Sequence, residues 1–558
     1  MSVSYNLLRE PWIPVALDDG RRVFVRPCEI SEPHDGQAIL RVATGRPDCD
    51  ISLTEFLIGL LAVTVGPKNQ RDWLKRYRTA PSRADLEAAF APLTPAMNLD
   101  GEGPRFFQDW NKFDGRSWPC ASLFGDAPGD NAIKENSDHF IKRGRYKRLS
   151  RAGAAVALLT LQSIAPAGGS GQFSALRGPG PMTTLILPAS RSGGSANLWE
   201  MLWANVPAHF DGQIHDLGRI FPWMSPTRTA ASVGITTPDH VATAQCFFGM
   251  PRRVKLNFTE LSDVAQCDLL GCFDSTCITT FEMKSGGTNY DAWPSVHPLT
   301  PVLKPGAQQA FRSYQLRSAR VGYRQWSGIV SATASGLSLP AKSIVEFARR
   351  ATDLDDPEKK ASRILAAGYV FKPGQATALD FGEALLPLIV TGDARADDEV
   401  HRFAEQFVTA ADLIANQLSN VVKRALFGEA AKADRGSTVL DAVRQRFWAD
   451  TEQDFYAALR DSADLLVEAK GELGDKIDAI RMARGMAWLG KMRAAALAVF
   501  DETAPIDDAA GDKIKDLIEG RRLLTFALRG YGAVGGQVFT ALWQPQVETK
   551  ARKGRKAA

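Results

Sequence analysis

The stretch 164–181 combines residue types that suit contact with a phosphate-bearing partner. Three of its glycines stand close together: Gly168, Gly169 and Gly171. They leave a short span of backbone bare of side chains, which permits positive φ and the close approach of a ligand. Arg177 follows with a permanent charge and a fork of donors suited to phosphate.

The same stretch matches no nucleotide-binding motif. No Lys-Ser or Lys-Thr follows its last glycine, as a P-loop requires. Pro179 and Pro181 interrupt the segment where a Rossmann fingerprint would open a helix. Two interpretations stay open: the glycines contact a large polyanion such as a duplex, or they form a flexible connection.

Catalytic groups with a recognisable spacing are absent from the sequence. The seven histidines include no H-E-x-x-H motif and no metal-type pair. Gly169-Ser170-Gly171 lacks the flanks of a nucleophile elbow, because Gln172 stands where the second glycine is needed. No carboxylate pair stands out among the 63 acidic residues. The residues therefore give no case for catalysis.

Four cysteines in the middle of the chain raise the question of a metal. They are Cys246, Cys267, Cys272 and Cys277. Zinc usually recruits C-x₂₋₄-C pairs, and four residues separate each of the last three cysteines from the next. Zinc and free buried thiols are both compatible with this spacing, and we expect free thiols and no bound metal.

Composition places the chain among ordinary globular proteins. It has 558 residues, of which 45% are hydrophobic, and a formal net charge of +4. The N-terminus lacks a basic region followed by an apolar one, and the most apolar run, 56–66, is too short to span a bilayer. We therefore expect a soluble, cytoplasmic protein with reduced thiols. A basic tail, 546–558, is expected to be disordered.

The elements that must position the glycine stretch form an irregular α+β domain over 1–395. Two β-rich runs around Asp-Asp-Gly predict a hairpin over 12–25. A helix is expected over 52–65, with Thr54 or Ser52 as its N-cap. Short β-like runs near 182–188 and 253–258 alternate with long connections rich in glycine and proline.

Beyond residue 395 the pattern changes to four long amphipathic segments, which predict a four-helix bundle over 396–545. We expect them at 399–426, 437–468, 475–500 and 513–528, with Ser437 as an N-cap. Several basic residues lie on these segments: Arg444, Arg446, Arg481, Arg484, Lys491 and Arg493. A solvated surface is the expected meaning of such residues, and a phosphate-facing stripe is the alternative.

Separate segments carry a resemblance to a known family. Residues 6–15 read NLLREPWIPV, and residues 281–298 read FEMKSGGTNYDAWPSVHP. The glycine stretch precedes LRG and MTT within 176–184, and GY precedes GQA within 368–376. Together with the helix bundle, these segments resemble the large subunit of the type I-E CRISPR surveillance complex Cascade, the CasA family.

The resemblance implies roles for individual residues. The family's glycine loop corresponds to four residues: Gly168, Gly169, Ser170 and Gly171. Its minor-groove lysine corresponds to Lys284, and its glutamine wedge to Gln375, flanked by Gly374 and Ala376. The aromatic residue that contacts the 5′ handle of the guide RNA corresponds to Phe140. An ordinary surface lysine and a plain turn residue are the alternatives for Lys284 and Gln375.

The resemblance also implies a function. A large subunit of this kind is no enzyme: it recognises the protospacer-adjacent motif (PAM) of foreign duplex DNA, promotes strand separation and recruits a helicase-nuclease. Its implied partners are the other Cascade subunits, the guide RNA, the double-stranded target and that helicase-nuclease, with no membrane. Two rivals remain: a standalone enzyme whose glycine loop binds a phosphate-bearing small molecule, and a purely structural scaffold.

Overall fold

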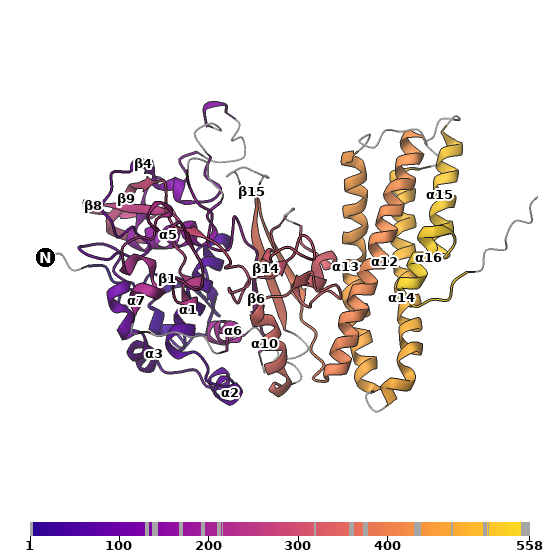
Figure 1. The fold of residues 1–558 in the computed structure, drawn as a ribbon, viewed down its shortest axis with the longest axis horizontal. Coiled ribbons are helices and arrows are strands. Elements are labelled where there is room, and N and C mark those ends of the chain that lie inside the picture. Colours follow the sequence, from indigo (N-terminus) through magenta and orange to yellow (C-terminus); the bar gives the residue numbers. More distant parts are fainter. Residues whose placement is uncertain are drawn as a thin grey trace, which may run out of the picture. The chain divides into compact units, whose positions relative to one another are not determined.

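The structure is a computed structural model (Figure 1). It describes residues 4–128, 133–136, 143–166, 171–190, 196–208, 214, 216–316, 320–355, 362–371, 378–428, 437–469, 472–505, 511 and 513–547. The chain divides into two compact units. Unit 1 comprises Met1–Val321, Gly328–Ala332 and Gly336–Leu388, and unit 2 comprises Gly322–Ser327, Thr333–Ser335 and Ile389–Ala558. Helices and strands are mixed in unit 1, whereas unit 2 is helical, so the α+β class with a helical C-terminal part is confirmed.

The N-terminal hairpin forms as predicted. Strands β1 (Ile13–Leu17) and β2 (Arg22–Val25) pair antiparallel, and β3 (Ile39–Val42) adds to the other edge of β1. Helix α1 (Pro47–Val65) begins five residues before the predicted start, so Ser52 and Thr54 are interior residues and not N-caps. Pro47 occupies the first turn, where its missing N–H costs no hydrogen bond.

A long hairpin dominates the sheet that carries Lys284. Strand β8 (Arg253–Gln266) pairs antiparallel with β9 (Phe273–Lys284), and β4 (Arg116–Pro119) and β5 (Leu149–Ser150) also pair with β9. Helix α5 (Arg151–Ile164) follows β5 and ends at the start of the glycine stretch. Nearly all residues of α5 are buried, so the helix is held firmly in the core and fixes the position of the first residues of the glycine stretch.

A second sheet contains the segment expected to hold the glutamine wedge. Strand β14 (Arg363–Phe371) pairs antiparallel with β15 (Ala378–Pro387) on one side and with β6 (Thr183–Leu187) on the other. The hydroxyl of Tyr369 on β14 donates to Asp48 on α1 at 2.6 Å. Burial, with a contribution from Asp48, raises the pKa of Tyr369, so this hydroxyl keeps its proton.

Unit 1 also contains further helices. They include α2 (Gln70–Arg78), α3 (Arg83–Phe90), α6 (Leu198–Asn205) and α10 (Lys342–Arg350). Of these, α6 and α10 contact strand β6, and α2 contacts α6. Tryptophans join two of them: Trp73 and Trp203 each donate an indole N–H to the other's backbone carbonyl, at 3.2 and 2.9 Å.

Unit 2 contains the four predicted long helices. They are α12 (Ala394–Phe427), α13 (Ser437–Glu468), α14 (Leu473–Thr503) and α15 (Ile514–Leu528), and a shorter helix, α16 (Gly532–Ala541), follows them. Trp488 is fully buried, stacks on Phe407 and donates its indole N–H to the Phe407 carbonyl at 3.1 Å. Across the described ranges, no helix is both long and apolar enough to cross a bilayer.

Candidate functional site

A cavity of about 630 Å³ in unit 1 brings Lys284 close to the glycine stretch. Its wall is formed by β4, the segment that follows β4, the two described flanks of the glycine stretch and the end of β9. The polar and aromatic lining residues include Asp114, Arg116, Trp118, Gln172, Arg252 and Lys284. The Arg116 guanidinium lies 4.1 Å from the centre of the Trp118 ring. The cavity therefore offers cationic and aromatic surface to a ligand.

Lys284 is the last residue of β9 and is exposed. Its backbone pairs with Arg253 at the start of β8, so the strand register fixes where the side chain leaves the sheet. Within the described ranges its amine makes no hydrogen bond and no ion pair. The neighbouring Lys255, by contrast, lies 3.5 Å from Glu282. The amine of Lys284 is thus available to an acceptor outside the chain.

Gly171 lies beside the turn that follows Lys284. Its carbonyl accepts a hydrogen bond from the Gly286 amide at 2.9 Å. Its φ of +75° is in the left-handed region, which a side chain disfavours, so glycine suits this position. The structure therefore brings together two of the predicted site residues, Gly171 and Lys284. The other members of the predicted loop, Gly168, Gly169 and Ser170, lie outside the described residues.

The remaining predicted contacts also lie outside the described part of the chain. Gly374, Gln375 and Ala376 fall between β14 and β15, whose last pairing before the gap joins Phe371 to Ala378. They are thus flanked on both sides by paired antiparallel strands. Phe140 lies in the undescribed range 137–142.

Arg177 is not available to phosphate, which corrects its interpretation from the sequence. It is 4% exposed, and its guanidinium forms an ion pair with Glu55 at 2.8 Å. Its other terminal nitrogen donates to Thr183 and Thr300, at 3.1 and 3.0 Å. All three partners lie inside unit 1, so Arg177 holds the core together.

Sequence reasoning missed Arg252. It is 5% exposed and donates to the Pro166 carbonyl at 2.6 Å and to Gln172 Oε1 at 2.8 Å. Burial lowers the pKa of Arg252 to about 10, which still leaves it charged at neutral pH. Its acceptors lie 80 and 86 residues away in the sequence, so no local pattern could have identified it.

The four cysteines weighed for zinc do not converge. Within the part of the chain that the structure describes, no three His, Cys, Asp or Glu side chains are placed to hold a metal. Cys246 is buried near Arg177 and Glu55. Cys267 and Cys272 do lie together, and a hydrogen bond between their thiols lowers the pKa of Cys267.

The basic residues of the helix bundle are largely compensated. Arg481 forms an ion pair with Glu399 at 2.8 Å, and Arg484 with Asp461 at 2.9 Å. Further pairs join Arg444 to Asp441, Arg446 to Glu502 and Lys491 to Asp454. Arg493 donates to the Leu528 carbonyl. These contacts favour the solvated-surface interpretation over a phosphate-facing stripe.

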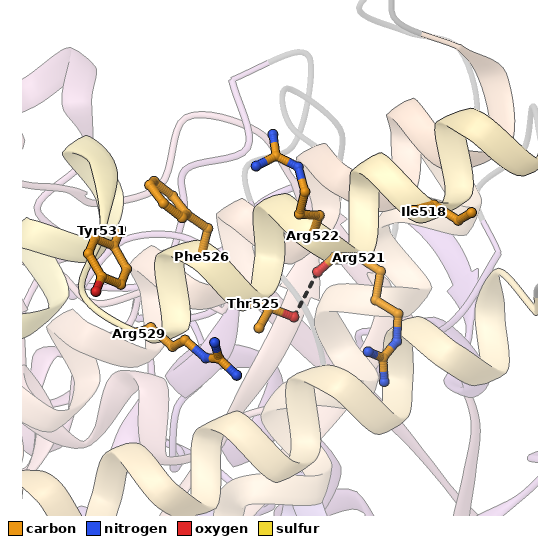
Figure 2. Close-up of a pocket in the computed structure, with 7 residues that line it drawn as sticks. All are labelled: Ile518, Arg521, Arg522, Thr525, Phe526, Arg529 and Tyr531. Carbon is orange, nitrogen blue, oxygen red and sulfur yellow. Dashed lines mark hydrogen bonds between the residues drawn. The ribbon is translucent and has the colours of Figure 1, made fainter. Parts of the chain in front are cut away.

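A smaller cavity, of about 350 Å³, lies along α15. Figure 2 shows its side chains spaced along that helix and the turn after it. Arg521 pairs with Asp501 and Arg522 with Glu519, each through two hydrogen bonds. Two of the three arginines of this cavity are thus paired with carboxylates, which weakens their attraction for an anion.

Comparisons with known proteins agree on one family. The family model described as CRISPR-associated protein Cse1 matches residues 6–498. The fold resembles that of Thermus thermophilus CasA (Cse1), with a TM-score of 0.66 and 18% identity over 94% of this chain and 99% of that one. The fold also resembles that of Cse1 from Acidimicrobium ferrooxidans, with a TM-score of 0.65 and 16% identity over 98% of this chain and 100% of that one.

A chain of a structure described as a CRISPR RNA-guided surveillance complex is also similar. It gives a TM-score of 0.66 and 15% identity, over 94% of this chain and 99% of that one. At these identities the solved structures establish the fold. No curated protein sequence matches this chain.

Proposed function

The chain belongs to the CRISPR-associated Cse1 family, and from that premise we propose that it is the non-catalytic large subunit of a type I-E CRISPR RNA-guided complex. In this role it recognises the PAM of double-stranded DNA from the minor groove, promotes strand separation and recruits a helicase-nuclease. One observation supports the proposal: the Gly171–Gly286 hydrogen bond holds bare backbone against the turn that follows Lys284, and within the described residues the Lys284 amine makes no ion pair.

The chemistry of the minor groove fits this pairing. A·T and T·A pairs both present acceptors there, and a G·C pair adds one amino donor. The Lys284 amine donates to those acceptors, and backbone without side chains can approach the floor of the groove closely. Because the groove carries few distinguishing atoms, such reading is permissive, and several PAM sequences are expected to be tolerated.

The other roles follow the same proposal. Gln375, with Gly374 and Ala376, enters the duplex from the β14–β15 connection and separates base pairs, at a cost of a few kcal/mol of stacking per step. Phe140 contacts the 5′ handle of the guide RNA, and pairing of the guide then roughly balances the lost DNA pairing. The other subunits of the complex and the helicase-nuclease are protein partners, and the assembly acts in the cytoplasm.

The proposal is tested with two matched lysine variants in the reconstituted complex. Lys284→Ala should weaken PAM-dependent duplex binding by roughly 1–3 kcal/mol, the scale of one good base contact. Lys255→Ala removes the same charge from the same hairpin, but Lys255 is paired with Glu282 and does not line the cavity. It should leave binding nearly unchanged. Equal effects of the two variants would contradict a specific role for Lys284.

A further inference from the structure

Arg252 connects the two flanks of the glycine stretch. One terminal nitrogen donates to the carbonyl of Pro166, before the stretch, and the other donates to the side chain of Gln172, after it. The backbone of Arg252 is itself fixed, because its amide donates to Gln162 Oε1 and its carbonyl accepts from Gln162 Nε2, each at 3.0 Å. The guanidinium therefore extends from a rigid base on α5 to both flanks.

The charge of Arg252 is uncompensated, unlike that of the other buried arginines. Four arginines of the described chain are buried, and three of them contact a carboxylate: Arg46 with Asp48, Arg177 with Glu55 and Arg350 with Glu346. Arg252 contacts only neutral oxygens, and its Nε lacks a partner in the described residues. Because burying an unpaired charge is costly, stability alone does not favour an arginine here.

The position held by Arg252 leads directly to Lys284. Gln172 is adjacent in sequence to Gly171, and the carbonyl of Gly171 accepts the Gly286 amide. Gly286 lies two residues after Lys284, in the turn that ends the β9 strand. Arg252 also precedes Arg253, the residue that pairs with Lys284 across the hairpin. A shift of the guanidinium would therefore displace both the turn that follows Lys284 and the strand that pairs with Lys284.

We propose that Arg252 is a positioning residue for DNA recognition: by holding Pro166 and Gln172 together it sets Gly171 against the turn that carries Lys284. The planar fork of arginine suits this task, since it reaches two separate acceptors with fixed geometry. The inference rests on the proposed function, because it gives Arg252 a purpose only if Gly171 and Lys284 contact DNA.

Three substitutions distinguish a positioning role of Arg252 from an effect of its charge. Arg252→Gln removes the charge and the fork, and Arg252→Lys keeps the charge but loses the fork. Gln172→Glu keeps an acceptor for Arg252 while neutralising its charge. Arg350→Gln is the control for losing a buried arginine, since Arg350 is equally buried at 5% exposed and does not line the cavity.

Two readouts are measured for each variant. The first is hydrogen–deuterium exchange of a peptide covering 283–290 in the free chain, which reports the Gly286 amide. The second is selectivity of the reconstituted complex, taken as the ratio of its affinities for duplexes with a permitted and a forbidden PAM. We expect both Arg252 variants to exchange faster and to lose selectivity by about tenfold, as for one lost base contact. Gln172→Glu and Arg350→Gln should keep the wild-type exchange and selectivity.

The outcomes are distinct. Unchanged exchange in Arg252→Gln overturns the proposal, and so does faster exchange with selectivity intact. Loss of selectivity in Gln172→Glu with wild-type exchange would assign the effect to charge and also overturn positioning. If the wild-type complex itself showed no PAM selectivity, the proposed function would fail, and exchange would still decide whether Arg252 holds the Gly171–Gly286 contact.

Discussion

Gly180 packs directly against Phe371, the last residue of β14 before the segment that contains Gln375. A Cβ atom at Gly180 would lie 2.4 Å from Cε2 of the Phe371 ring. The backbone of Gly180 has φ +52°, in the left-handed region. The end of the glycine stretch therefore supports the base of the β14–β15 hairpin. Two segments for which we propose different contacts with DNA share one packing contact.

Gly180→Ala should destabilise unit 1 by about 1–3 kcal/mol, the usual cost of overpacking. The reason is that Phe371, held in β14, must move to admit a methyl group. Gly20→Ala is the control, since Gly20 also has positive φ but has nothing within 4 Å of its added Cβ. Urea denaturation followed by tryptophan fluorescence would show a lower midpoint for Gly180→Ala than for Gly20→Ala. Equal midpoints would mean that the Phe371 ring moves aside for the methyl group without a measurable loss of stability.

Arg177→Met should destabilise the chain by about 3–5 kcal/mol, because it leaves the Glu55 carboxylate buried without its cation. Adding Glu55→Gln should recover part of that loss, since the uncompensated charge is then removed. Denaturation of the single and double variants measures both effects. A variant that keeps full stability but loses duplex binding would restore Arg177 as a phosphate ligand.

Gln375→Ala should slow duplex opening more than it weakens initial binding, because a wedge acts when base pairs separate. Binding is measured by anisotropy of a labelled duplex, and opening by fluorescence of 2-aminopurine placed beside the PAM. A duplex with a mismatched bubble at that position is the control, since it needs no wedge. Equal effects on binding and opening would argue against the assignment.

Sequence periodicity predicted the long elements well and the short, tightly packed ones poorly. The predicted bounds of α13, 437–468, agree with the structure because a long amphipathic stripe is repeated over many turns. Helix α16 was missed because its glycines mask the helical pattern. One of them, Gly535, approaches α15 so closely that a Cβ would lie 2.7 Å from the Ala527 carbonyl.

In the candidate site too, the prediction succeeded where neighbouring residues carried the signal and failed where the contacts join residues far apart in the sequence. Lys284 was found through a resemblance in the residues around it, and its place at the end of β9 leaves the amine uncompensated. Arg177 was misjudged because its partner Glu55 lies 122 residues away, so the residue type gave no sign of burial. Arg252 was missed for the same reason. The sequence shows that an arginine carries a charge and a forked guanidinium. Which groups surround that guanidinium, and therefore what it binds, is determined by the fold.

His297 gives unit 1 a predictable response to acid. Its ring is fully enclosed, and its Nδ1 accepts the Leu299 amide at 3.2 Å. Burial, with a smaller contribution from Arg177, holds the pKa of His297 well below its usual range. The unfolded chain, in which this histidine titrates at ~6.5, therefore binds more protons than the folded one below that pH. Stability contributed by the neutral ring is complete above about pH 6.5 and falls as the pH drops further.

The expected slope is up to about 1.4 kcal/mol per pH unit for this one group. His297→Asn removes the titrating ring and keeps an oxygen acceptor near the Leu299 amide. Urea denaturation of the wild type and the variant is compared from pH 7.5 to 5. The wild type should lose its advantage over the variant as the pH falls, whereas His401 and the carboxylates, present in both, cancel in the difference. Parallel curves would show that His297 takes up its proton without leaving the folded core.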